Sequence, residues 1–172
     1  IAVDEEGHGR TAATDRPLTA ENSADDVKAV LDELNVDSVD VLGFSAGGHT
    51  ALALAMRYPA SVRCLIAAST FVSRDAVSDD FWDGMAKGTL AEMPEVLKDA
   101  DRRLNPEPGH LERLFDLDRQ RILTFPGWPD DDLRRITART LVLGADRDVM
   151  SPEHAVRMSR VIPGARLMIV PG

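Results

Sequence analysis

The sequence predicts an α/β protein with a mainly parallel sheet flanked by helices, and two observations carry this prediction. Short apolar runs typical of strands alternate with helical stretches at both ends of the 172-residue chain. Between these ends, from 71 to 137, the alternation stops and amphipathic helices are separated by Pro and Gly. We therefore predict one core, built from residues 1–70 and 138–172, with residues 71–137 inserted as a helical lid or cap.

The elements of the predicted core follow from local patterns. Strands are expected at 1–3, 39–44, 62–68, 140–144 and 166–170, where apolar and β-branched residues gather. Helices are expected at 19–34, 46–58 and 152–161. In the first helix, apolar residues recur at intervals of three and four, which predicts a stripe that packs on the sheet: Val27, Val30, Leu31 and Leu34.

Composition argues against several kinds of function. The chain has 29 acidic and 20 basic residues and a net charge of -9, so it repels phosphate backbones and nucleic acid is not an expected partner. No apolar run approaches the ~18 residues that a membrane helix needs. A single cysteine, Cys64, allows neither an internal disulfide nor a cysteine-based zinc site, and it favours a reducing, cytoplasmic location.

Both ends of the chain predict an internal part of a longer protein. The chain opens on an apolar run without Met, and it closes on Pro171 and Gly172 directly after a strand pattern. A signal peptide preceding Ile1 would be invisible here, so the sequence does not decide export.

One motif points to chemistry. Residues 43–47 read Gly-Phe-Ser-Ala-Gly and match G-x-S-x-G, the nucleophile elbow, with an apolar strand before it and an Ala-rich helix after it. Chemistry of this kind needs a serine at the apex of a tight turn, with glycines two residues either side leaving room for the strand and the helix. The alternative interpretation is that Ser45 only caps the helix that follows.

With this motif and others, the chain resembles a serine-dependent, esterase-like member of the α/β-hydrolase family. The resemblance is carried by Gly7-His8-Gly9-Arg10-Thr11, by residues 43–48, by the link 57–62, by the strand and acid loop 141–148, and by Ser151-Pro152-Glu153. In that register the chain begins at family strand four, ends after strand eight, and carries its cap after strand six. Family strand three would lie between strands four and five. Its absence implies either that 1–3 pairs with 39–44 or that 39–44 becomes an open edge.

The resemblance also implies roles. Ser45 would be the nucleophile, and the amide of Ala46 would be one oxyanion donor, the second coming from a loop that this chain lacks. The acid would lie after family strand seven, where both Asp146 and Asp148 are available. The usual spacing favours Asp148 and leaves Asp146 as the second choice.

None of the four histidines fits the general base, which in the family follows strand eight. We interpret His8 as structural in its turn, His49 as directed to packing or to the surface, His110 as the start of a lid helix, and His154 as exposed. The catalytic histidine is therefore expected outside the chain, and the chain by itself is expected to be close to inert.

The aromatic residues indicate what kind of substrate to expect. Either they form a small core of the lid, or they also line an apolar cavity above Ser45; the candidates are Phe44, Phe71, Phe81, Trp82, Phe115, Phe125 and Trp128. We expect a small apolar ester-like substrate, no cofactor and no metal, and the oligomeric state stays open. The alternatives are a non-catalytic small-molecule receptor, and a carbon–carbon hydrolase or cofactor-free oxidation enzyme of the same fold.

Overall fold

The computed structural model describes residues 1–172 and divides into two compact units. The sheet unit comprises Ala20–Ser78 and Pro126–Gly172, and the helical unit comprises Ile1–Thr19 and Asp79–Phe125. These bounds differ from the predicted division, because residues 1–19 group with the inserted helices while 71–78 and 126–137 group with the sheet.

The sheet has four parallel strands in the order β1-β2-β3-β4. Their bounds are Val39–Phe44 for β1, Val62–Ala68 for β2, Arg139–Ala145 for β3 and Arg166–Val170 for β4. Because all four run the same way, the loops that follow them emerge at one edge. The predicted α/β class with a parallel sheet is confirmed.

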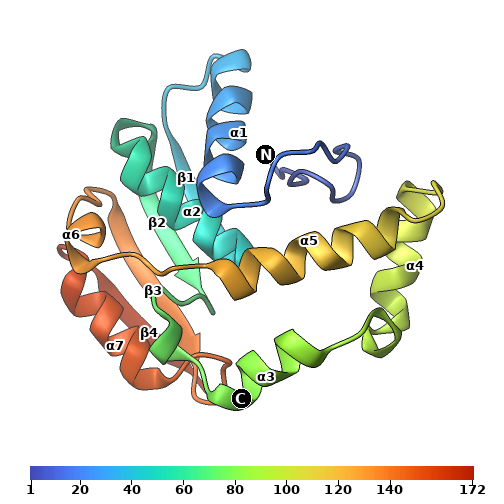
Figure 1. Cartoon of the computed structure of the whole chain (residues 1–172). Helices are drawn as coiled ribbons and strands as arrows, with labels where there is room; N and C mark the ends of the chain where they lie inside the picture. Colours follow the sequence, from blue (N-terminus) through green and yellow to red (C-terminus); the bar gives the residue numbers. More distant parts are fainter. The chain divides into compact units, whose positions relative to one another are not determined.

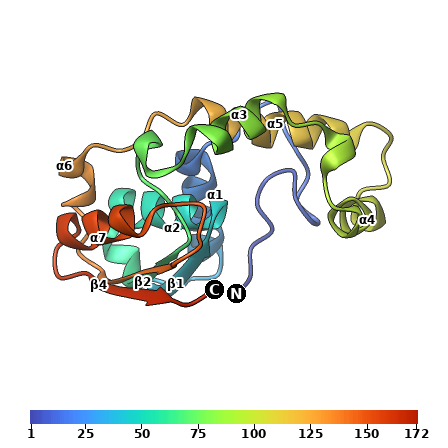
Figure 2. The same ribbon diagram turned by 90° about the horizontal axis from the view of Figure 1, so that it is seen from below.

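Helices cover one face of this sheet (Figure 2). Helix α2 (Ala46–Arg57) packs on β1 and β2, and α7 (Pro152–Val161) packs on β3 and β4. Helix α1 (Ala20–Glu33) packs on α2 instead (Figure 1). The prediction that its apolar stripe lies on the sheet was therefore wrong: the main contacts of α1 are with α2 rather than with a strand, and Leu31 is buried while Val30 and Leu34 are exposed.

The other face of the sheet carries exposed apolar side chains. Leu42 on β1 is 67% exposed and Met168 on β4 is 50% exposed. Between them lie Ile66 and Leu143, which are partly buried. Strand β1 pairs only with β2, so of the two outcomes expected for 39–44 the open edge is the one observed.

The remaining short elements connect the strands and helices. Helix α6 spans Asp130–Leu133, and three 3-10 turns span Pro59–Ser61 (η1), Arg74–Ala76 (η2) and Leu90–Glu92 (η3). No helix combines the length and the apolar character that crossing a membrane would require.

The helical unit consists of three helices and the first segment of the chain. Its helices are α3 (Asp79–Lys87), α4 (Glu95–Leu104) and α5 (His110–Thr124), with α5 contacting both others. Residues 1–3 form no strand and Ile1 is exposed, so the strand predicted there was wrong. An apolar run forms a strand only where a neighbouring strand can satisfy its backbone.

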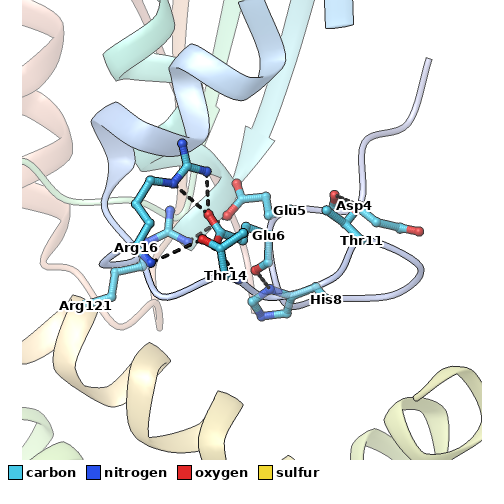
Figure 3. A network of polar contacts seen from close by, with 8 residues as sticks. All are labelled: Asp4, Glu5, Glu6, His8, Thr11, Thr14, Arg16 and Arg121. Carbon is cyan, nitrogen blue, oxygen red and sulfur yellow. Dashed lines mark hydrogen bonds and ion pairs between the residues drawn. The ribbon is translucent and has the colours of Figure 1, made fainter. Parts of the chain in front are cut away.

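Ion pairs attach residues 1–19 to α5 and to one another (Figure 3). Arg121 donates to Glu5 at 2.7 Å, and Glu6, only 5% exposed, accepts from the amide of Thr14 at 2.8 Å and from Nε of Arg16 at 2.9 Å. Burial disfavours the ionised form of Glu6, but the hydrogen bonds from Thr14 and Arg16 outweigh it, so the pKa of Glu6 is lowered. Glu5 and Glu6 thus each have an arginine as partner.

Candidate active site

Ser45 stands at the turn between β1 and α2. Its backbone has φ 53° and ψ -120°, a combination that costs about 1–3 kcal/mol for a residue with a Cβ. The residue is exposed, and its side chain makes no capping hydrogen bond to α2. The interpretation of Ser45 as a simple helix cap therefore finds no support in the geometry.

The glycines around Ser45 differ in their need for small size. A Cβ on Gly43 would lie 2.2 Å from the carbonyl oxygen of Gly47 and 2.7 Å from Cβ of Ala51, so strand and helix approach closely there. A Cβ on Gly47 would meet nothing within 4 Å, which corrects the expectation that both motif glycines make room. Gly48 takes that role, because a Cβ there would lie 2.5 Å from Cβ of Thr70.

The two candidate acids follow β3 and make different contacts. The carboxylate of Asp148 is half-buried and accepts from the amides of Val149 at 2.7 Å and Ala145 at 3.3 Å. The carboxylate of Asp146 is exposed and accepts from the amide of Gly172 at 2.7 Å. Asp148 thus folds into its own loop, while Asp146 is attached to the residues that follow β4.

Ser45 and this acid loop lie at the same edge of the sheet. Ser45 follows β1 and Asp148 follows β3, and β2 lies between these parallel strands. Two strand spacings, or about 10 Å, separate the backbone of β1 from that of β3. The sheet unit therefore brings the predicted nucleophile and acid to one edge, and their catalytic roles stay predictions.

The four histidines all make structural contacts. His8 directs Nδ1 to the carbonyl of Glu6 at 3.0 Å and Nε2 to the carboxylate of Asp118 at 2.9 Å. Because both partners accept hydrogen bonds, the ring fits best when charged, and the hydrogen bond to Asp118 raises the pKa of His8. In the helical unit, His110 opens α5 as expected and places Nδ1 3.3 Å from Asp101.

In the sheet unit, His49 is buried in α2 and donates from Nε2 to the carbonyl of Phe71 at 2.8 Å. His154 is only 5% exposed, and its Nε2 accepts from the amide of Val72 at 3.1 Å. The expectation of an exposed His154 was wrong, because the segment after β2 covers the first turn of α7. No sequence signal reveals these two contacts, since the partners are backbone atoms.

The seven aromatic candidates are divided between the two units. Phe81, Trp82, Phe115 and Phe125 belong to the helical unit, and Phe44, Phe71 and Trp128 belong to the sheet unit. Rings of Phe81 and Trp82 contact each other at 5.2 Å within α3, and Phe71 contacts His49 at 4.8 Å. Phe44 is exposed on the uncovered face of the sheet. The seven residues thus do not form one cluster within a single unit, and their role in binding substrate stays a prediction.

Each unit also contains a pocket. In the sheet unit, a groove of about 460 Å³ is lined by Trp128 with Tyr58, Arg57 and Glu21, and Nε1 of Trp128 donates to Glu21 at 3.0 Å. In the helical unit, a cavity of about 560 Å³ lies between α4 and the loop before α5. Its lining contains none of the seven aromatic candidates.

Comparison with known proteins identifies relatives of the chain. The family model for the alpha/beta hydrolase fold matches residues 1–107. A 2-hydroxy-6-oxo-2,4-heptadienoate hydrolase of Pseudomonas putida is 29% identical over 163 residues, 81% of this chain and 58% of that protein. A pimeloyl-[acyl-carrier protein] methyl ester esterase of Neisseria meningitidis is 39% identical over 92 residues, 54% of this chain and 34% of that protein.

Among solved structures, a meta-cleavage product hydrolase from Pseudomonas fluorescens matches with a TM-score of 0.77 at 18% identity, covering 97% of this chain and 69% of that one. The chain thus spans only part of the length of these relatives. Together with the parallel sheet and the strained serine turn, the family match shows that the chain belongs to the α/β-hydrolase fold family.

Proposed function

We propose that the protein containing this chain hydrolyses an ester or related acyl compound, with Ser45 as the nucleophile. The backbone of Ser45 carries the proposal: a non-glycine residue at φ 53°, exposed between a strand and a helix, is the conformation expected of a nucleophile elbow. Residues held in such strained backbone conformations cluster at active sites.

The proposed reaction proceeds in two steps. Oγ of Ser45 attacks the acyl carbon while its proton passes to a general base, and the amide of Ala46 stabilises the negative charge on the oxygen. The alcohol leaves with that proton, and water then releases the acid from the acyl-enzyme. Asp148 would orient the base, because the ends of β1 and β3 are about 10 Å apart and an imidazole fits between groups that follow these two strands.

The base itself is proposed to be a histidine outside these 172 residues. Each histidine of the chain already makes a hydrogen bond elsewhere: His8 with Asp118, His49 with Phe71, His110 with Asp101 and His154 with Val72. No metal or other cofactor enters the proposed steps, and the substrate is proposed to be small and apolar.

A second candidate is hydrolysis of a carbon–carbon bond. The relative that aligns over 163 residues is by name a 2-hydroxy-6-oxo-2,4-heptadienoate hydrolase, whereas the esterase relative aligns over 92 residues. The same serine site would serve both reactions, so the two candidates are distinguished by testing which substrate the protein turns over.

The test uses the whole protein with Ser45→Ala as the decisive variant. A fluorophosphonate probe should label the unmodified protein, since Oγ displaces fluoride and a stable phosphonyl-serine forms, and Ser45→Ala should abolish labelling. Turnover of p-nitrophenyl esters should fall by about 10⁵ or more. Ser69→Ala is the matched control, because Ser69 also follows a strand and has φ 47°.

Three outcomes separate the candidates. Labelling at Ser45 with ester turnover supports the proposal. Labelling with turnover of a 6-oxo-2,4-dienoate and none of any ester supports the second candidate. A whole protein that binds small molecules but neither labels nor turns over a substrate would be the non-catalytic receptor, and the proposal would be wrong.

A further inference from the structure

The two chain segments that connect the sheet unit to Asp79–Phe125 meet at one point. After β2 the chain passes through Phe71 and Val72, and it returns through Gly127 and Trp128. The amide of Trp128 donates to the carbonyl of Val72 at 2.9 Å. Gly127 has φ 80°, and a Cβ there would lie 3.0 Å from the same carbonyl oxygen. We call these four residues the junction.

Two buried histidines from different helices bind the junction. His49 of α2 donates from Nε2 to the carbonyl of Phe71 at 2.8 Å, and His154 of α7 accepts from the amide of Val72 at 3.1 Å. The ring of His49 also meets the rings of Phe71 and Trp128 edge to face, at 4.8 and 5.6 Å between centroids. The single peptide group between Phe71 and Val72 is thus held at both of its polar atoms, from the two helices that cover the sheet.

The partners require opposite tautomers of the two rings. A carbonyl oxygen only accepts, so Nε2 of His49 carries its hydrogen; an amide only donates, so Nε2 of His154 carries none. Each histidine therefore hydrogen-bonds to a backbone group of the loop that follows β2. Neither role can be filled by an apolar side chain of similar size.

His49 also connects the junction to the serine turn. Its backbone amide donates to the carbonyl of Ser45 at 3.3 Å, while its side chain donates to Phe71. One residue thus contacts both the strained turn and the point where the inserted segment leaves the sheet unit.

We infer that His49 and His154 are positioning residues: together they fix the junction from which Asp79–Phe125 extends, and so influence which substrates the site accepts without taking part in the chemistry. The effect on substrate choice rests on the proposed function. The fixing of the junction does not, and it can be measured in a protein of any activity.

The direct test is amide hydrogen exchange in the whole protein. His154→Leu should speed exchange of the Val72 amide at least tenfold, because its acceptor is lost. His154→Gln should keep most of the protection, since the Gln oxygen reaches the position of Nε2. The effect of His49 on the Trp128 amide is indirect, because that amide donates to the carbonyl of Val72. His49→Leu releases the neighbouring carbonyl of Phe71 and should therefore speed exchange of the Trp128 amide, whereas His49→Gln should not.

Controls separate local from global effects. His110→Leu removes a histidine paired with Asp101 in the helical unit and should leave Val72 and Trp128 unchanged. Val142, buried in β3, should keep its protection in every variant. Equal protection of Val72 in the Leu and Gln variants at position 154 would overturn the inference.

Two further measurements test the inference: one observes the tautomers directly, and the other compares substrate preference between variants. In the unmodified protein, imidazole ¹⁵N shifts should show hydrogen on Nε2 of His49 and on Nδ1 of His154; any other pair of tautomers contradicts the inference. For activity, the Leu variants should change the ratio of kcat/KM between short and long acyl esters several-fold while the Gln variants restore it. If the unmodified protein hydrolyses no ester, the proposed function fails, yet the exchange data still decide the junction.

Discussion

The amide of Ser45 donates a hydrogen bond to the carbonyl of Ala68 at 2.9 Å. The ladder between β1 and β2 therefore continues one residue beyond Phe44, and the chain turns into α2 only after Ser45 is fixed to its neighbour. The strain at Ser45 is thus held from the strand side by Ala68 and from the helix side by the close approach of Gly43 to Gly47.

The first prediction concerns that close approach. Gly43→Ala should destabilise the protein by about 2–4 kcal/mol, because the new methyl would overlap a backbone carbonyl that cannot move without shifting α2. Gly47→Ala is the matched control, since a Cβ there meets open space and Ala favours a helix by about 1 kcal/mol. Urea unfolding of both variants measures the difference. Equal stabilities would show that β1 and α2 do not approach each other closely at Gly43.

A second prediction distinguishes the two acids. If Asp148 orients the base, Asp148→Asn should lower kcat about 10³–10⁴-fold, because the imidazole loses its charged partner. Asp146→Asn should change kcat less than threefold, since Asp146 is exposed and attached to Gly172. Asp146→Asn keeps an oxygen for the amide of Gly172, whereas Asp148→Asn keeps an acceptor for only one of its two amide donors and should also cost about 1 kcal/mol of stability. The opposite ranking of kcat would transfer the role to Asp146.

Elements with a strong local signal were predicted closely. Helix α7 begins at Pro152 and ends at Val161 as predicted, since proline at the first position and the cap residue Ser151 mark its start. The interiors of the four sheet strands were also predicted. The apolar run at 1–3 was misleading, because a strand depends on a partner that the run itself does not contain.

Contacts between distant segments account for what the sequence could not show. The Ser45 turn was predicted because its geometry is encoded in five consecutive residues. The burial of His154 depends on Val72, 82 positions away, and the attachment of Glu5 depends on Arg121, 116 positions away. No periodicity or motif connects such pairs, so the histidine roles emerge only from the structure.

A third prediction follows from the burial of His154. Burial lowers the pKa of His154 from 6.5 to about 4, with Arg157 lowering it further and Asp75 opposing. The unfolded chain therefore binds a proton that the folded protein does not, so the contribution of His154 is full above pH 6.5 and declines as pH falls toward 4. The slope should approach about 1.4 kcal/mol per pH unit.

The measurement is urea unfolding at pH 7.5 and pH 5.0 in unmodified protein and His154→Gln. The change in the free energy of unfolding between the two pH values is then compared between the two proteins. Their difference isolates the contribution of His154 from that of the other titrating groups. The variant should be less sensitive to acid, and an unchanged difference across this range would mean that His154 ionises freely in the folded state.

A fourth prediction has the opposite sign and concerns His8. The hydrogen bond to Asp118 raises the pKa of His8 above 6.5, so this pair stabilises the folded protein below that pH, and the contribution is lost as pH rises through the raised value. An NMR titration of His8 should show the elevated pKa, and Asp118→Asn should lower it toward 6.5. Asp116→Asn, on the same helix but paired with Arg119, should leave it unchanged.

The last prediction concerns the uncovered face of the sheet. Leu42 is 67% exposed beside partly buried Ile66 on an edge strand, and such a surface favours association between copies of the chain. Leu42→Lys should therefore reduce light scattering of the 172-residue chain at micromolar concentration, while changing the free energy of unfolding by less than about 0.5 kcal/mol.

Leu104→Lys is the matched control: Leu104 is 52% exposed on α4, and the substitution makes the same change in charge. Because the chain carries a net charge of -9, either lysine brings the net charge closer to zero, which by itself promotes association. A fall in scattering with Leu42→Lys alone would thus identify the sheet face, and equal behaviour of the two variants would show that the uncovered strands are not the site of association.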